Sequence, residues 1–300
     1  MRTVITGATG LIGQSLVKRF KRPVVLSRNA NKAFSKLGNV EAYGWTPSQG
    51  PPPKEALEGA DVVFSLAGEP VAGGRWTSAK KKRIYDSRVL GVNNLVSCLS
   101  KLTSKPRVLI SASAIGIYGE RGEEELDETA FYGNDFLARV CIDWEKEALA
   151  AVELGIRVVC IRFGIVLSRN GGALAQMLPV FRMGLGGKLG SGSQWMSWIH
   201  IDDAVNLLCH VVENESIEGA LNATAPTPVT NADFTRSLAR QINRLAIFPV
   251  PRFGLKLAFG EMSDVVMTSQ KVLPNKARDL GFEFQHTQLE SALSDLLKAS

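Results

Sequence analysis

The chain opens with Met1-Arg2-Thr3-Val4-Ile5-Thr6-Gly7-Ala8-Thr9-Gly10-Leu11-Ile12-Gly13, and this stretch decides the fold. Residues 2–6 have the β-branched character of a strand, and the apolar residues of 10–20 repeat with helical spacing. Between them, Gly7 allows a tight turn, Gly10 leaves room for a pyrophosphate, and Gly13 lets helix and strand pack closely. A strand, a glycine triplet and a helix in this order predict a dinucleotide-binding turn, with the phosphates at the helix N-terminus.

The end of the next predicted strand indicates which dinucleotide is bound. An acidic side chain about 20 residues beyond the turn would bind a ribose 2′-hydroxyl. Residues 23–27 end instead in Ser27 and are followed by Arg28, without a carboxylate. A hydroxyl and a forked cation suit a 2′-phosphate, although an arginine after a strand is also commonly solvated. The sequence therefore favours NADP over NAD.

Short apolar segments alternate with helical ones through the first half of the chain. Further strands are predicted over residues 40–45, 61–67, 107–112 and 156–163, and longer helices over residues 76–101 and 135–154. Strands that are apolar throughout and separated by helices indicate a parallel sheet covered on both faces. We therefore expect an α/β fold, a Rossmann-type doubly wound parallel sheet with a smaller α+β C-terminal substrate lobe.

The composition changes after Leu167, where residues 171–192 are rich in glycine. A short helix is predicted over residues 173–182, and another begins at His200-Ile201-Asp202-Asp203, where either aspartate could cap it. We expect residues 1–167 to form the cofactor domain and residues 198–221 to return to it. Residues 168–197 and 222–300 are then the cleft loops and the C-terminal lobe.

Composition restricts the class of protein. The 300 residues are 45% hydrophobic and 21% charged, which excludes a disordered chain. The net charge of +6 is mild and suits a small anionic ligand, so no nucleic-acid partner is expected. The four cysteines have neither metal-ligand nor redox spacing, so we expect reduced thiols and no metal site. Without a long apolar run or a recognisable targeting signal, we expect a cytoplasmic protein that does not bind membranes.

Several short motifs resemble the extended short-chain dehydrogenase/reductase superfamily. They are the glycine turn, the strand end Leu66-Ala67-Gly68-Glu69, the pairs Tyr118-Gly119 and Trp144-Glu145, and the run Trp198-Ile199-His200-Ile201-Asp202-Asp203. The chain is most similar to the atypical, epimerase-like subgroup, whose members are labelled nucleoside-diphosphate-sugar epimerases or, in some cases, cell-division inhibitors. Residues 231–293 resemble the C-terminal domain of that subgroup, so the likeness covers essentially the whole chain.

The resemblance implies cofactor contacts beyond the glycine turn. Superfamily members carry an asparagine in the long fourth helix, and the matching residue here is Arg88, which could reach the pyrophosphate or Glu69. The basic run at residues 80–83 lies just before it and is interpreted as a solvated helix face. The predicted cofactor-binding residues are Gly7, Thr9, Gly10, Leu11, Ile12, Gly13, Ser27, Arg28, Leu66, Ala67, Gly68, Glu69, Arg88, Leu137, Phe163 and Gly164.

The catalytic residues of the superfamily are missing at their usual positions. Its chemistry rests on a Tyr-x-x-x-Lys pair, in which the lysine one turn away lowers the pKa of the tyrosine for proton exchange. Alignment on Glu145 places Leu137 and Cys141 in these two positions, and neither can take that role. The remaining catalytic candidates are Ser113, beside the usual serine position, and Tyr132, which precedes the helix.

Trp195 and His200 are the candidate substrate residues. Trp195 could wall a pocket and stack against a ring, or it could equally belong to the core of the second lobe. His200 lies near the expected cleft, although a structural role beside Asp202 or Asp203 is the plainer interpretation.

Together these observations predict an NADP(H)-binding oxidoreductase or epimerase-like protein that acts on a small molecule of unknown identity. Any hydride chemistry would take its proton from Ser113 or from water. The alternative is a catalytically weak or silent NADP(H)-binding module that acts through a protein partner. A homodimer built on two long helices is compatible with the resemblance.

Overall fold

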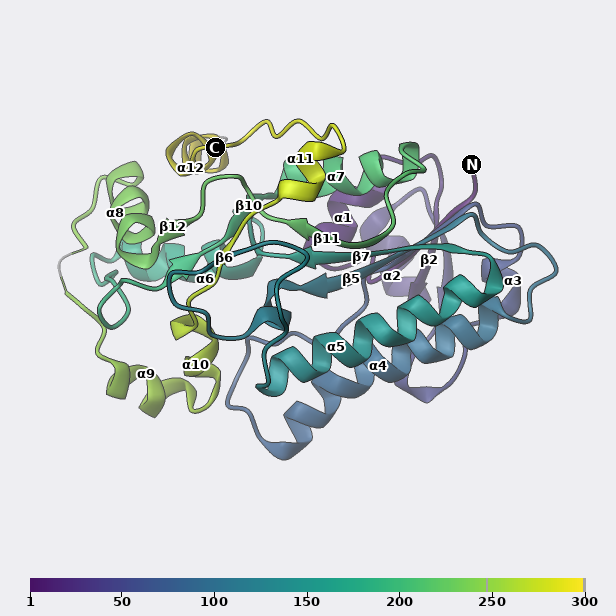
Figure 1. Ribbon diagram of the computed structural model, residues 1–300, viewed down its shortest axis with the longest axis horizontal. Coiled ribbons are helices and arrows are strands. Elements are labelled where there is room, and N and C mark those ends of the chain that lie inside the picture. Colours follow the sequence, from purple (N-terminus) through teal and green to yellow (C-terminus); the bar gives the residue numbers. More distant parts are fainter. Residues whose placement is uncertain (247, 299–300) are drawn as a thin grey trace.

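A sheet of seven parallel strands forms the centre of the molecule, in the order β11-β7-β5-β4-β1-β2-β3 (Figure 1). The computed structural model describes residues 1–246 and 248–298. The strands are β1 (Thr3–Thr6), β2 (Val24–Ser27), β3 (Glu41–Gly44), β4 (Val62–Ser65), β5 (Val108–Ala114), β7 (Arg157–Phe163) and β11 (Gly219–Ala223). The predicted doubly wound parallel sheet is therefore confirmed.

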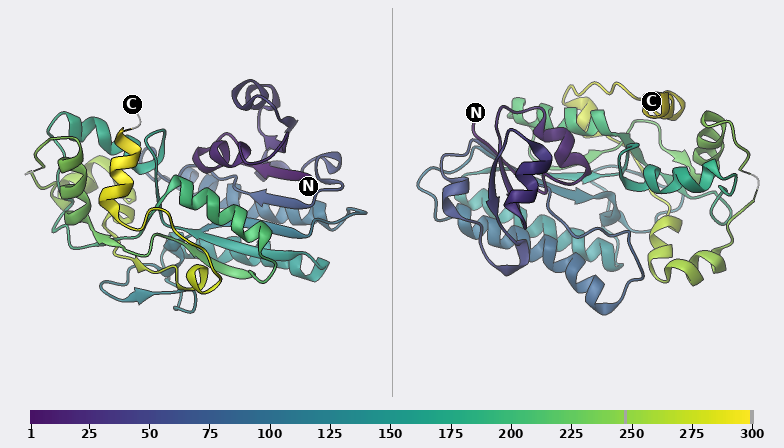
Figure 2. Two further views of the ribbon diagram at one scale, coloured as in Figure 1. Left: turned by 90° about the horizontal axis from the view of Figure 1, so that it is seen from above. Right: turned by 180° about the vertical axis from the view of Figure 1, so that it is seen from behind.

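Helices cover both faces of this sheet (Figures 1 and 2). On one face lie α1 (Leu11–Val17), α2 (Ala30–Leu37) and α7 (Ile201–Glu213), of which α1 and α7 pack against each other. On the other face, α4 (Ser78–Leu99) and α5 (Phe136–Leu149) run side by side. Short elements complete this half: η1 (Pro47–Gln49), α3 (Lys54–Leu57), η2 (Ile115–Tyr118) and η3 (Ala150–Leu154).

The central strands are buried on both faces, which explains their continuous apolar sequence. Val63 and Phe64 of β4 and Ile110 of β5 are fully buried, and the Phe64 ring lies 5.6 Å from that of Phe20 behind α1. Burying such side chains contributes about 1.5–3 kcal/mol each, so this core holds the strand ends in fixed positions. Those ends carry the residues of the candidate site.

A second lobe lies at the end of the molecule away from the N-terminus (Figure 1). Two small pairs of strands, β8 (Ile165–Leu167) with β10 (Trp198–His200) and β9 (Trp195–Met196) with β12 (Val229–Thr230), connect it to the sheet. Its helices are α6 (Gly172–Arg182), α8 (Asn231–Gln241), α9 (Arg252–Phe259), α10 (Met262–Met267) and α12 (Leu289–Lys298). The tail also returns to the first half, because β13 (Lys271–Val272) pairs with β6 (Glu125–Leu126), and α11 (Asn275–Asp279) packs on β11.

Two details differ from the sequence-based expectation. The side chain of His200, and not an aspartate, caps α7, because its Nδ1 accepts a hydrogen bond of 3.1 Å from the backbone N–H of Asp202. Asp203 instead accepts two backbone N–H groups, from Gln285 and His286, and so fixes the tail to α7. Strand β11 extends to Ala223, so it crosses the boundary that was expected after residue 221.

Among residues 1–246 and 248–298, no helix is long and apolar enough to cross a membrane.

Candidate functional site

The glycine turn lies where the strand order reverses, because β1 pairs with β2 on one side and with β4 on the other. Gly7 has a φ of +67°, and a Cβ atom there would lie 2.6 Å from the carbonyl of Leu66. At Gly13, a Cβ would lie 2.6 Å from the Cα of Ala8. A Cβ at Gly10 would lie 3.1 Å from the carbonyl oxygen of Gly7. Glycine is therefore needed at Gly7 and Gly13 by the close approach of backbone, while Gly10 keeps the surface of the turn open.

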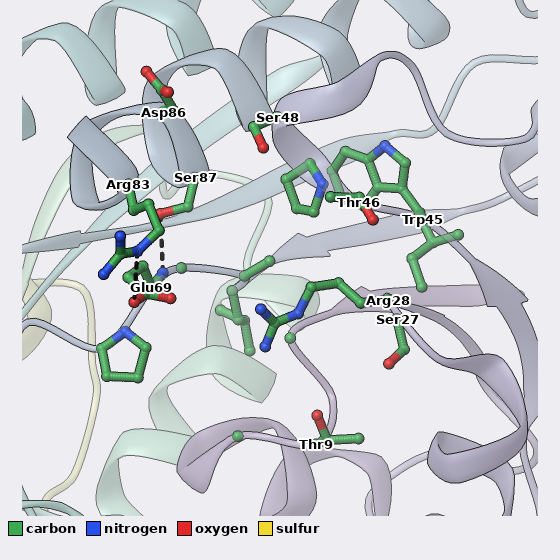
Figure 3. Close-up of a pocket in the computed structure, with 18 residues that line it drawn as sticks. Thr9, Ser27, Arg28, Trp45, Thr46, Ser48, Glu69, Arg83, Asp86 and Ser87 are labelled. Atoms are coloured by element: carbon green, nitrogen blue, oxygen red, sulfur yellow. Dashed lines mark hydrogen bonds and ion pairs between the residues drawn. The ribbon is translucent and has the colours of Figure 1, made fainter. Parts of the chain in front are cut away.

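A first cavity of 350 Å³ opens beside this turn (Figure 3). It is bounded by the ends of β1, β2 and β4, and the Arg28 side chain lies across it from the strand end (Figure 3). The predicted residues that line it are Gly7, Thr9, Gly10, Ser27, Arg28, Leu66, Ala67, Gly68 and Glu69. The structure thus brings the glycine turn and the proposed 2′-phosphate residues to one recess.

The sequence analysis missed part of this wall. Residues 45–48, which follow β3, and Arg83, Asp86 and Ser87 of α4 also line the first cavity (Figure 3). A usable signal did exist for residues 45–48, because the carboxyl ends of parallel strands meet at one edge of a sheet. The α4 residues had no comparable signal, since they approach from a helix that crosses the edge.

Glu69 joins the loop after β4 to the first turns of α4. Its carboxylate accepts a hydrogen bond of 2.8 Å from Lys80 Nζ and lies 3.5 Å from Nε of Arg83. The Lys80 contact, opposed by burial, lowers the pKa of Glu69 below its usual range. Lys80 is buried, so the interpretation of residues 80–83 as a solvated face is wrong at that position.

Arg88 reaches the same loop. Its Nη1 donates a hydrogen bond of 3.0 Å to the backbone carbonyl of Glu69, and the guanidinium lies 5.2 Å from the ring of Trp144. A Cβ at Gly68 would lie 3.1 Å from Cζ of Arg88. The guanidinium is therefore held directly beside the strand end that lines the first cavity.

A second cavity, also 350 Å³, continues from the first, since both are lined by Gly7, Gly10 and Leu66. The predicted residues Leu11, Ile12, Gly13 and Phe163 line it, together with Ala112 of β5. Gly164 is not in its wall. A Cβ there would lie 2.5 Å from the carbonyl oxygen of Ser197, so this glycine serves a close backbone approach to the second lobe.

A third cavity of 240 Å³ lies between the start of α5 and helix α10 of the second lobe. Leu137, in the position of the superfamily tyrosine, is part of its wall. Cys141, in the position of the lysine, is buried behind it, and burial raises the pKa of its thiol to about 12. At neutral pH the two positions therefore present a hydrocarbon and a protonated thiol.

A buried ion pair lies on the α5 side of the sheet. Arg162 of β7 binds Glu145 of α5 through two hydrogen bonds of 2.9 Å, and the Arg162 side chain is only 1% exposed. Burial alone would lower the pKa of Arg162, but the Glu145 contact prevails and raises it. Tyr118 accepts a hydrogen bond of 2.9 Å from Arg162 and donates one of 2.7 Å to Asn222. Tyr118 is fully buried, and burial raises its pKa to about 12.

Both catalytic candidates belong to this network and line none of the three cavities. Ser113 is buried, and its hydroxyl donates a hydrogen bond of 2.6 Å to Glu145. Tyr132 is 52% exposed, and its hydroxyl accepts a hydrogen bond of 3.2 Å from Arg162. Their proposed catalytic roles stay predictions.

The two substrate candidates also lie outside the three cavities. Nε1 of Trp195 donates a hydrogen bond of 2.6 Å to Glu123, and Lys271 Nζ lies 4.6 Å from the centre of the indole. His200 is buried under the ring of His286 at 3.7 Å. Their roles toward a substrate stay predictions.

His200 also belongs to the one group of residues whose spacing resembles a metal site among those described. Donor atoms of His200, Asp202, His286 and Asp295 lie within 4.8 Å of one another. Because Nδ1 of His200 accepts a backbone N–H, the neutral ring carries its proton on Nε2, 3.4 Å from Asp295. Nε2 then has no lone pair for a metal, and the geometry fits a structural contact between α7 and α12.

The family model of the NAD dependent epimerase/dehydratase family matches residues 3–223. The chain belongs to this family. A second model, described as a domain of unknown function, matches residues 250–296 of the C-terminal lobe. Both matches confirm the predicted epimerase-like likeness and its separate C-terminal domain.

Named relatives span nearly the whole chain. The chloroplastic epimerase family protein SDR39U1 homolog of Arabidopsis thaliana is 40% identical, over 99% of this chain and 87% of that protein. Epimerase family protein YfhF of Bacillus subtilis is 39% identical, over 99% of this chain and 98% of its own length. The crystal structure of human epimerase family protein SDR39U1 (isoform 2) with NADPH has a TM-score of 0.87 at 29% identity, and the match covers 100% of both chains.

Proposed function

We propose that this family member binds NADP(H) and is an oxidoreductase or epimerase-like protein whose substrate lies beside the nicotinamide. The observation that carries the proposal is the joint placement of Arg28, Ser27 and the glycine turn around the first cavity. The human relative, whose crystal structure contains NADPH, supports the same cofactor. A cytoplasmic location and a homodimer, both expected from the sequence, stay predictions.

The residues fit a phosphorylated dinucleotide in chemical terms. Arg28 is exposed and has no ion-pair partner in residues 1–246 and 248–298, so its guanidinium is available to a 2′-phosphate. Gly10 leaves the surface of the turn open for a pyrophosphate and, as the N-cap residue of α1, has no side chain to bond the free N–H groups of the helix. Arg88 places a fixed cation next to Gly68, in the loop that follows β4 and lines the first cavity.

The nicotinamide, when bound, supplies or accepts a hydride. A group of the protein or a water molecule must then donate or accept the accompanying proton. Leu137 and Cys141 cannot do so, because one is apolar and the other has a pKa of about 12. Ser113 is buried, and its hydroxyl is engaged in a hydrogen bond to Glu145. The arrangement therefore supports water as the proton source, which lacks the roughly 10²–10⁴-fold gain of a positioned acid or base.

The same observations favour a second candidate function. A protein that keeps its cofactor cavity but has Leu137 and Cys141 in place of the proton-transfer pair could act as a silent NADP(H)-binding module. It would act through a protein partner and would not turn over a substrate.

One measurement tests the cofactor, and a second one distinguishes the two functions. Calorimetric titration with NADPH and NADH tests the cofactor, and equal affinity for both would contradict the proposal. Loss of nicotinamide absorbance across a panel of carbonyl compounds then tests catalysis. Slow but substrate-dependent oxidation supports the oxidoreductase, and NADPH binding without oxidation of any substrate supports the silent module.

A further inference from the structure

The third cavity has a chemistry that restricts what it can bind. It lies between the start of α5 and helix α10, and its described lining residues are Trp76, Gly116, Asp135, Phe136, Leu137, Glu261, Asp264, Val265, Thr268 and Gln270. We propose that it takes a small substrate with an apolar ring or chain that carries hydrogen-bond donors or a positive charge. This inference rests on the proposed function, because it treats the cavity as the substrate side of the NADP(H) site.

The apolar part of the cavity wall is formed mainly by Trp76, before α4, and by Phe136 and Leu137, at the start of α5. The rings of Trp76 and Phe136 meet edge to face at 5.4 Å, and Lys81 lies 5.4 Å from the centre of Phe136 on the side of α4. Leu137 packs toward Gly116, where a Cβ would lie 3.6 Å from the Cβ of Leu137. At 240 Å³, the cavity falls below the range of about 300–1,000 Å³ that is usual for drug-sized ligands. A single ring fits this wall, and a nucleoside diphosphate with a sugar is too large for it.

The polar side chains of the wall offer acceptors to a ligand, because Trp76 and Thr268 already donate to backbone carbonyls. The backbone N–H groups at the start of α5 are the donors of this wall. Gln270 uses its amide N–H groups on the backbone carbonyls of Ile115 and Gly119, both at 3.0 Å, which leaves its amide oxygen to accept. The Asp264 carboxylate is exposed and has no ion-pair partner within residues 1–246 and 248–298. The carboxylate of Asp135 accepts the backbone N–H of Ala138 at the start of α5. A ligand that pairs with these side chains must therefore bring donors.

The cations of α4 near the cavity are bound to carboxylates, whereas Arg75 and Arg139 donate to the backbone carbonyls of Leu257 and Asp135. Lys81 forms an ion pair with Glu261, and Lys80 and Arg83 both contact Glu69. No lysine or arginine is among the described residues that line the cavity. An anionic ligand therefore meets the Asp264 carboxylate without a cationic side chain in the described wall.

The test uses three probes of the same shape and different charge on the NADPH-loaded protein: benzamidine, benzamide and benzoate. Ligand-observed NMR measures their dissociation constants, with UDP-glucose as a fourth probe. We expect benzamidine to bind about 2- to 5-fold more tightly than benzamide, as an exposed charge pair allows, and benzoate and UDP-glucose to bind more weakly than either. Tighter binding of benzoate or UDP-glucose would overturn the proposal.

Two variants assign the binding to this cavity. Asp264→Asn should remove the preference for benzamidine over benzamide, while Asp279→Asn, an exposed change on α11, should leave it intact. Val265→Trp should fill the cavity and abolish binding of benzamidine and benzamide. If the preference survives Asp264→Asn, or if binding survives Val265→Trp, the probes bind elsewhere and the inference is wrong. NADPH affinity, measured separately on each protein, shows whether the proposed function has failed instead.

Discussion

The two ends of the strand edge differ in how their charged groups are used. At the ends of β1, β2 and β4, Arg28 is exposed beside an open cavity and has no ion-pair partner within residues 1–246 and 248–298. At the ends of β5 and β7, Arg162 is 1% exposed and is closed on Glu145, with Ser113 bound to the same carboxylate. The first end keeps a cation free for a ligand, and the second end uses its cation to hold the fold. The residues predicted to bind the cofactor therefore stay accessible at the first, open end. The catalytic candidate Ser113 is held in the buried network of the second, closed end.

The largest effect should come from the closed end, where Arg162 is buried against Glu145. Glu145→Ala leaves the Arg162 guanidinium buried without its carboxylate, and breaking such a pair costs about 3–5 kcal/mol of unfolding free energy. Urea denaturation measures the loss, and Glu283→Ala, at an exposed position of the tail, is the control. The double change of Glu145→Leu with Arg162→Met should recover part of the stability, since it removes both charges. A loss below about 1 kcal/mol for Glu145→Ala would show that the pair does not hold this end of the sheet.

At the open end, Gly10→Val should abolish NADPH binding without unfolding the chain. The new Cβ lies 3.1 Å from the Gly7 carbonyl, and its methyl groups occupy the open surface of the turn. We expect a loss of affinity of about 100-fold or more, equivalent to roughly 2.7 kcal/mol, by calorimetry. Far-UV circular dichroism should remain unchanged, and Gly44→Ala, where nothing lies within 4 Å of a new Cβ, should bind normally. Retained affinity in Gly10→Val would mean that the glycines serve only the packing of the turn.

The open end could be predicted from sequence because its signals are local. The glycine turn, the strand that ends in Ser27 and the missing carboxylate lie within the first 30 residues, and each has a direct physical meaning. The parallel sheet followed in the same way, from apolar strands alternating with helices. The cap of α7 was predicted wrongly because the two aspartates after His200 are more common capping residues than histidine. In the structure the His200 ring accepts the free N–H, and Asp203 binds the backbone of the tail.

The closed end and the third cavity could not be predicted in this way. Arg162 lies within the buried strand segment Cys160-Ile161-Arg162-Phe163, which does indicate a buried partner, but the sequence does not say which acid supplies it. Asp264 and Gln270 reach the cavity from the other lobe, more than a hundred residues from Leu137. The Arg162 pair depends on how α5 packs on the sheet, and the third cavity depends on how the C-terminal lobe packs against α5. No local pattern encodes either arrangement.

The choice between cofactors gives an intermediate effect. Arg28→Ala should weaken NADPH binding by about 10- to 100-fold, as expected for a charge-assisted contact, and should leave NADH affinity nearly unchanged. Calorimetry with both cofactors makes NADH the internal control, because the two differ only in the 2′-phosphate. An equal loss of affinity for NADPH and NADH would show that Arg28 supports the turn and does not bind the 2′-phosphate.

The smallest effect should come from Tyr132→Phe, which tests whether the closed end takes part in chemistry at all. The Tyr132 hydroxyl accepts one hydrogen bond of 3.2 Å from Arg162, while the ring, 5.3 Å from the guanidinium, stays in the variant. Arg162 keeps both contacts with Glu145, so stability should fall by no more than about 1 kcal/mol. Oxidation of NADPH across a carbonyl panel should be slow in the wild type and equally slow in Tyr132→Phe. Tyr43→Phe, which removes the hydroxyl that donates to Glu41 on β3, is the matched control. Fast oxidation that collapses only in Tyr132→Phe would show that this hydroxyl reaches the substrate, and the separation of binding from chemistry between the two ends would then be wrong.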